Sequence, residues 1–72
     1  MKVTAEEVLL EANVSNITEN TKDWIEYVIE LFEEGEDSSI MEEYSCLEYA
    51  EACGEDVESS YKLIKAVELL YS

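Results

Sequence analysis

Carboxylates are the functional groups that this sequence supplies in quantity. No basic residue lies between Lys22 and Lys62, and that stretch holds 14 of the chain's 19 Asp and Glu residues. On a helix, steps of three or four residues rise about 4.5–6 Å, so acids at this spacing form a row about 20 Å long on one face. The residues that we expect in this row, if its last turn continues, are Asp23, Glu26, Glu30, Glu33, Glu34, Glu36 and Asp37.

A straight row of negative charge can act as a substitute for nucleic acid. One DNA strand presents a phosphate about every 3.4 Å of helix axis. A rigid row of carboxylates can therefore enter a basic groove built for DNA, in a complex that long-range attraction steers and salt weakens. The alternative is a solvated acidic face that only keeps the protein soluble. Helices of that kind usually relieve like-charge repulsion with interleaved Lys, and this stretch has none.

Composition excludes several other kinds of chemistry. With 4 Lys, no Arg and a net charge of −15, the chain is not expected to bind DNA, RNA or anionic membranes directly. The absence of His removes His-dependent zinc, haem and triad sites. Paired carboxylates need a pocket that separates their pKa values, and 72 residues leave little room for one. We therefore expect no enzyme, no cofactor and no specific metal site.

The two cysteines are expected to be free thiols. If Cys46 and Cys53 share a helix they lie about 10.5 Å apart along its axis, whereas a disulfide needs Cα atoms within roughly 7 Å. Free thiols are typical of a reducing compartment, and small apolar core residues are the simplest role for them. The chain has no long apolar run and its N-terminus turns acidic at once, so we expect a cytoplasmic protein without a membrane span or signal peptide.

The apolar periodicity predicts an all-α fold in which three main helices and a short N-terminal helix form one small domain over residues 1–72. Thr4 and Glu7 form a capping box that begins a short helix over 5–12. The Asn-, Ser- and Thr-rich stretch 13–20 predicts a loop, which Val14 and Ile17 attach to the core.

The second predicted helix carries the acidic row. Asn20 or Thr21 caps it, and it runs to Glu34 with Gly35 as the residue that ends it. Its apolar positions fill the side opposite the acids: Trp24, Ile25, Val28, Ile29, Leu31 and Phe32.

Two further helices complete the prediction. Ser39 and Glu42 form a second capping box, which begins a helix from Ile40 to about Cys53 that Gly54 stops. This helix has two apolar sides and is therefore expected to pack on both: Ile40, Tyr44 and Leu47 on one, and Cys46, Tyr49, Ala50 and Cys53 on the other. Asp56 caps the last helix, from Val57 to about Tyr71, whose apolar stripe is Val57, Tyr61, Ile64, Val67 and Tyr71, widened by Leu63 and Leu70.

Two resemblances suggest functions. In size, charge and helix content the chain resembles small phage-encoded inhibitors that mimic DNA, such as anti-restriction and anti-CRISPR proteins, which implies a partner in the host cell cytoplasm. Residues 47–51 (LEYAE) and 57–65 (VESSYKLIK) resemble part of the late-transcription coactivators of T4-type phages, small acidic adaptors that bind RNA polymerase and the sliding clamp. The chain departs from that family at Glu55, where an apolar residue is usual. The family-like positions are Tyr49, Lys62 and Ile64.

Three hypotheses follow. The first is an inhibitor whose acidic row occupies the basic nucleic-acid-binding groove of a nuclease, defence complex or polymerase. The second is a transcription adaptor that binds RNA polymerase through apolar and aromatic positions of its last two helices, including Tyr61 or Tyr71. The third is a homodimer, because a chain of this size buries only about 60% of its unfolded surface and a second copy can complete a thin core.

Overall fold

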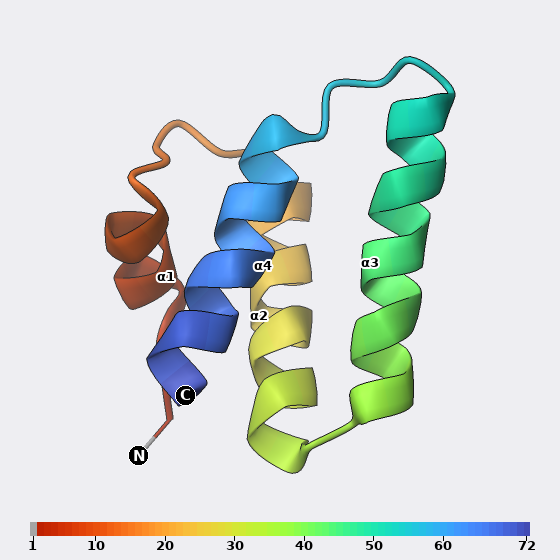
Figure 1. The fold of residues 1–72 in the computed structure, drawn as a ribbon. Helices are drawn as coiled ribbons and strands as arrows, with labels where there is room; N and C mark the ends of the chain where they lie inside the picture. The colour runs from red at the N-terminus through yellow and green to blue at the C-terminus, as the bar shows by residue number, and fades with distance from the viewer. Residues whose placement is uncertain (1) are drawn as a thin grey trace.

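Helices form all the regular structure of residues 2–72, the part of the chain that the computed structural model describes. Four helices follow one another along the chain and no strand occurs in these residues (Figure 1). The predicted all-α fold is therefore confirmed, with a short first helix and three longer ones. They are α1 (Ala5–Ala12), α2 (Glu19–Glu34), α3 (Asp37–Ala52) and α4 (Glu58–Tyr71).

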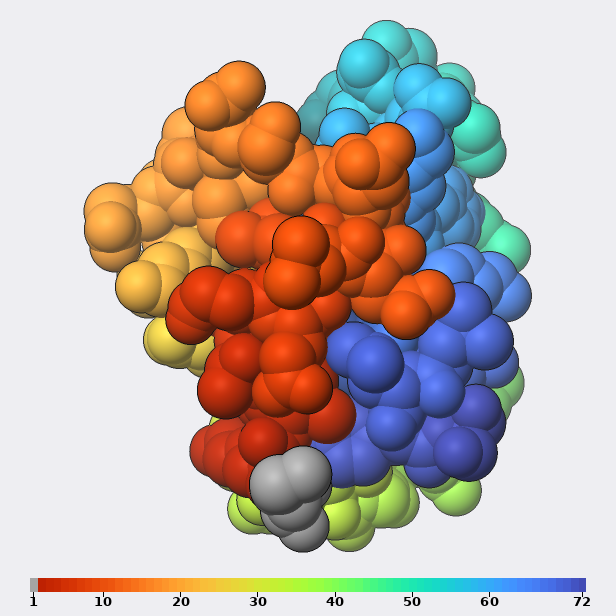
Figure 2. Space-filling model, turned by 90° about the vertical axis from the view of Figure 1, so that its left-hand side faces the viewer, coloured from red at the N-terminus to blue at the C-terminus, as the bar shows by residue number. Residues whose placement is uncertain are grey.

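Helices α2 and α4 pack against each other at the centre of the molecule. Helix α1 packs against both of them on one side, and α3 packs mainly against α2 on the other (Figure 1). Figure 2 shows the face that α1 covers, where α1 lies beside α4 and the following loop continues towards the start of α2. The bundle therefore has a three-helix body with α3 at its edge.

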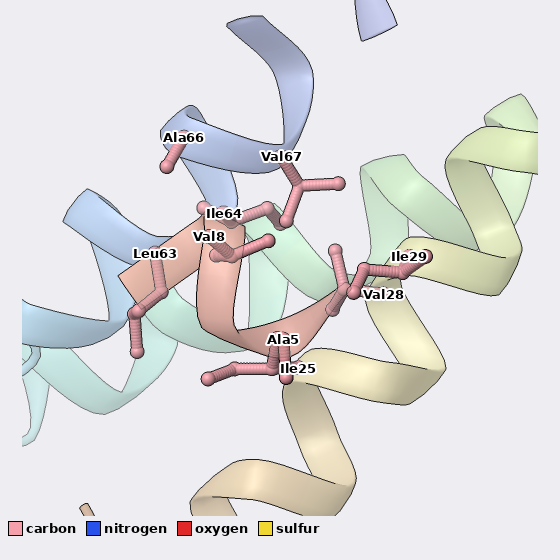
Figure 3. Close-up of a cluster of buried hydrophobic side chains, with 9 residues drawn as sticks. All are labelled: Ala5, Val8, Ile25, Val28, Ile29, Leu63, Ile64, Ala66 and Val67. Carbon is pink, nitrogen blue, oxygen red and sulfur yellow. The ribbon is translucent and has the colours of Figure 1, made fainter. Parts of the chain in front are cut away.

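The buried core comes from that three-helix body alone. Its side chains extend from α1, α2 and α4 towards one another (Figure 3). Val14 and Ile17 of the loop before α2 pack against the core, as predicted. The nine buried members are Ala5, Val8, Ile25, Val28, Ile29, Leu63, Ile64, Ala66 and Val67.

The predicted two-sided packing of α3 is wrong. None of its 16 residues is buried, and only the side that carries Tyr44 and Leu47 packs against the core. Its other side faces outward, with Tyr49 74% exposed. The expectation that Cys46 and Cys53 are core residues is wrong for the same reason: both are exposed, free thiols. Three helices already close the core, and no other segment of residues 2–72 covers the second side of α3.

The first two helices begin at threonine caps. The capping box of α1 is formed: the amide of Glu7 donates to the Thr4 hydroxyl, and the Glu7 carboxylate accepts from the Thr4 amide at 3.0 Å. Helix α2 starts earlier than predicted, because Thr18, and not Asn20 or Thr21, is its N-cap. The Thr18 hydroxyl accepts from the amide of Thr21 at 3.2 Å, which satisfies a first-turn donor and draws Glu19 and Asn20 into the helix.

The last two helices begin without a side-chain bond from their N-cap residue. The Ser39–Glu42 capping box is not formed, since α3 already starts at Asp37, directly after the left-handed Gly35 (φ 69°) and Glu36. Helix α4 starts at Glu58, one residue later than predicted, and the carboxylate of Asp56 accepts from the Glu58 amide at 3.2 Å. No helix in residues 2–72 combines the length and apolar character that crossing a membrane requires.

Candidate functional site

One side of α2 is a continuous surface of carboxylates, which we call the acidic face. At 3.6 residues per turn its members lie within about 100° of arc and extend about 22 Å along the helix. They lie opposite the buried Ile25, Val28 and Ile29, and all are exposed except Glu30, which is half-buried. The packed core thus holds this helix, and with it the backbone positions of six carboxylates: Glu19, Asp23, Glu26, Glu30, Glu33 and Glu34.

The acidic face contains five of the seven residues predicted from the sequence. The other two, Glu36 and Asp37, lie beyond the end of α2, because the left-handed conformation of Gly35 stops the helix. Glu36 is the N-cap residue of α3 and Asp37 its first residue. Both are exposed, but they belong to the turn between helices, so the row does not continue on α2 past Glu34.

The acidic face is not free of positive charge in three dimensions. The N-terminal segment brings Lys2 to the middle of α2, where its ammonium forms an ion pair with Glu30. The hydrogen bond to Glu30 raises the pKa of Lys2, and the negative charges of Glu30 and Glu33 add to the effect. Both partners are about half exposed, so the pair contributes little to stability and a stronger partner can displace it.

A hollow of ≈ 560 Å³ lies where the N-terminal segment and the start of α1 meet this part of α2. Lys2 and Lys22 line it together with three carboxylates, those of Glu6, Glu26 and Glu30. Glu6 belongs to α1, so the negative surface continues from α2 onto the neighbouring helix. The three carboxylates in this hollow can accept hydrogen bonds from Lys or Arg side chains of a partner.

The C-terminal half of the acidic face is tied to both ends of the described chain. The Tyr71 hydroxyl lies 3.4 Å from a carboxylate oxygen of Glu33, to which it donates, and 3.4 Å from the amide of Val3, from which it accepts. Asp23, Glu26 and Glu34 make no side-chain hydrogen bond or ion pair within residues 2–72. These three, with Glu19, are the carboxylates most open to a partner.

No protein-family model, curated protein or solved structure matches this chain. The family-like positions of the coactivator resemblance do not form one surface, because Ile64 is fully buried while Tyr49 and Lys62 are exposed on different helices.

Sequence reasoning missed two carboxylates of this region, Glu19 and Glu6. Glu19 had a local signal: it follows Thr18 directly, and acids are favoured in the first turn after a cap because of the helix dipole. Glu6 was recognisable as a first-turn acid of α1. Its position beside Glu26 and Glu30 depends on how α1 packs, which no local pattern encodes.

Proposed function

We propose that this protein is a non-enzymatic binding module, an inhibitor that places the acidic face of α2 in the basic nucleic-acid-binding groove of a nuclease, defence complex or polymerase. The observation that carries the proposal is the grouping of six carboxylates on one side of one helix whose other side is buried. Because the core holds the helix, a partner does not have to order its backbone on binding, which lowers the entropic cost of association.

The charge distribution supports the same proposal. Apart from the adjacent Glu33 and Glu34, successive acids on the face are about 4.5–6 Å apart along the helix axis, close enough to engage neighbouring Lys and Arg side chains in a groove that tracks a phosphate backbone. The net charge of −15 attracts such a groove from a distance and speeds association at low salt. DNA mimicry by this face therefore predicts a complex that forms fast and weakens as salt rises.

The test begins with capture of partners from a bacterial host lysate and elution with rising salt. A captured nucleic-acid-binding protein is then titrated with this protein in the presence and absence of its DNA. Competition is expected, because both ligands use the same groove. Binding that DNA leaves unchanged, or partners without a basic groove, would contradict the proposal.

Charge reversal then locates the contact on α2. Asp23→Lys with Glu26→Lys is expected to weaken binding by about a hundredfold or more, because charge reversal replaces attraction with repulsion in the groove. Glu30 is left unchanged because it already pairs with Lys2. The matched control, Glu51→Lys with Glu55→Lys, changes the net charge equally at exposed positions away from α2. Equal losses in both variants, with helicity preserved by circular dichroism, would show that only total charge matters.

Removal of Lys2, the ion-pair partner of Glu30, is an independent test of the acidic face as the contact. Lys2→Gln leaves Glu30 and Glu33 without their neighbouring ammonium, so the same partner is expected to bind a few-fold more tightly at low salt. Lys62→Gln makes the same change in net charge on the exposed side of α4. A larger gain for Lys62→Gln than for Lys2→Gln would argue against the acidic face as the contact.

The second candidate is a transcription adaptor that binds RNA polymerase through α4. A groove of ≈ 370 Å³ between α1 and α4 is lined by Tyr61, Lys62, Lys65 and Leu69, and Leu69 is 62% exposed. This groove is apolar and bordered by lysines. An apolar segment of a partner therefore fits it better than the basic groove of a nucleic-acid-binding protein would. This function predicts weak salt dependence and loss of binding in Leu69→Ser, with the Asp23 and Glu26 reversals nearly neutral.

A further inference from the structure

The outward side of α3 is apolar and unusually poor in charge for this protein. Seven exposed uncharged residues lie along it: Ser38, Met41, Ser45, Cys46, Tyr49, Ala52 and, directly after the helix, Cys53. Met41 is 69% and Tyr49 74% exposed. Among the exposed residues of Asp37–Cys53 within this arc of about 140°, only Glu42 is charged. We call this surface the outer face of α3.

Its low charge indicates what kind of partner fits it. The exposed side of α2 carries six carboxylates, so this protein places acids in abundance where contact with a basic surface is expected. A body of net charge −15 repels another acidic body least where its own surface charge is depleted. The outer face of α3 is such a place, and a second copy of this chain is an acidic body with a matching face.

We propose that two copies associate through the outer faces of their α3 helices, antiparallel and related by a two-fold axis. In a parallel pair Glu42 would face Glu42 of the partner subunit, which like-charge repulsion disfavours. In an antiparallel pair, residue i of one copy can face residue 94 − i of the partner subunit. With this register each large side chain meets a small one. Tyr49 then faces Ser45 of the partner subunit, Met41 faces Cys53 of the partner subunit, and Glu42 faces Ala52 of the partner subunit.

This contact is small, and its salt dependence is distinctive. One helix pair buries less than the roughly 800 Å² per partner of a standard interface, so the dimer is weak and forms at high protein concentration. Added salt screens the repulsion between the two copies and strengthens the dimer, whereas salt weakens the complex with a basic groove. The dimer does not depend on the proposed function, and opposite responses to salt keep the two tests separate.

Sedimentation equilibrium over a range of concentrations at low and high salt tests the proposal. We expect a monomer–dimer equilibrium that shifts towards dimer in high salt. Tyr49→Glu should raise its dissociation constant by about tenfold or more, since it places a charge in the contact. Tyr27→Glu, the same change at an exposed position on α2, should leave it nearly unchanged. A monomer at millimolar concentration in high salt, or equal effects of the two variants, would overturn the proposal.

Disulfide trapping tests the antiparallel arrangement. In a Met41→Cys, Cys46→Ser variant, thiols at positions 41 and 53 lie about 18 Å apart on one helix, beyond the reach of an internal disulfide. Oxidised glutathione takes up the two electrons and two protons that two thiols lose, giving one intersubunit disulfide and two molecules of reduced glutathione.

The expected result is a covalent dimer in that variant and none in the matched control, Cys46→Ser alone. In the antiparallel pair, the Cys53 residues of the two copies lie about 18 Å apart. A covalent dimer of the control would indicate a parallel pair and overturn the proposed arrangement. Monomers in both variants, under conditions where sedimentation shows dimer, would overturn it as well.

Discussion

At the scale of single residues, Tyr44 is the side chain that joins α3 to α4. Its hydroxyl donates to the Glu68 carboxylate at 2.8 Å, and its ring lies 6.5 Å from the ring of Tyr61. The ammonium of Lys65 lies 5.6 Å from the centre of the Tyr44 ring. Burial raises the pKa of Tyr44 to about 12, and the hydrogen bond and negative charge of Glu68 act in the same direction.

This pKa shift predicts a loss of stability at alkaline pH. The native state holds the Tyr44 proton more tightly than the unfolded chain, in which the pKa of tyrosine is about 10. The stabilisation is fully present below about pH 10 and is lost as pH rises through about 12, by on the order of 1 kcal/mol after allowance for solvent screening. Denaturation by urea at about pH 9 and about pH 11 measures about half of this loss, because pH 11 lies midway between the two pKa values.

Two phenylalanine variants serve as controls for that titration. Tyr44→Phe is expected to lose this part of the alkaline destabilisation. Tyr27→Phe, which removes an exposed phenol on α2, is expected to keep it. The pKa of Tyr61 is also raised, by burial and by the charges of Glu48 and Glu51, so both variants retain its contribution. An unchanged pH dependence in Tyr44→Phe would refute the assignment.

The candidate site could be predicted from the sequence only in part. The positions of Asp23 and Glu26 on one face follow from the helical period, which acts locally. The Lys2–Glu30 pair joins residues 28 positions apart and depends on how the N-terminal segment packs, which periodicity does not encode. The separation of Glu36 from the row depends on the backbone conformation of Gly35.

At the scale of helices, two similar capping signals have different outcomes. Thr18 occupies a true N-cap position in extended conformation and accepts from the Thr21 amide, whereas Ser39 lies inside α3. Thr18→Ala should therefore cost about 1 kcal/mol of unfolding free energy. Ser39→Ala should cost nothing and can gain up to about 0.5 kcal/mol, because Ala has the higher helix propensity. Urea denaturation compares them, and a Ser39→Ala loss equal to that of Thr18→Ala would mean that Ser39 caps the helix after all.

The sequence was sufficient to predict which segments are helical, but not which sides of α3 are packed. The helical period placed Ile25 and Val28 of α2 and Ile64 of α4 in the core, where they are buried. In α3, apolar residues on two sides suggested two packed sides. Whether a neighbour exists for the second side depends on the number of helices in the bundle, which is a global property of the fold.

At the scale of the whole molecule, like-charge repulsion opposes folding. The described chain carries its acids on a body with a radius of gyration of only 11.6 Å, and three of its four helices expose several carboxylates each. Raising NaCl from about 0.1 M to about 1 M shortens the Debye length from about 10 Å to about 3 Å. We expect a stabilisation on the order of 1 kcal/mol, seen as a rise in Tm of about 4–8 °C.

This salt effect is best measured at low protein concentration, where dimerisation does not contribute. A Glu26→Gln, Glu34→Gln variant carries less charge at exposed positions that make no ion pair in residues 2–72. It should be more stable than the parent at low salt and gain less from added NaCl. An equal gain in both proteins would attribute the effect to general salt exclusion and not to charge screening.

The edge position of α3 has a consequence for how this sequence can change over time. Substitutions at exposed positions usually alter unfolding free energy by less than about 0.5 kcal/mol, and none of the 16 residues of α3 is buried. Selection for folding alone therefore exerts little pressure on its outward side, and genetic drift would replace Met41 and Tyr49 with polar residues. If descendants with diverged sequences keep apolar side chains at these positions, that retention would indicate selection for an intermolecular contact, separately from selection for the fold.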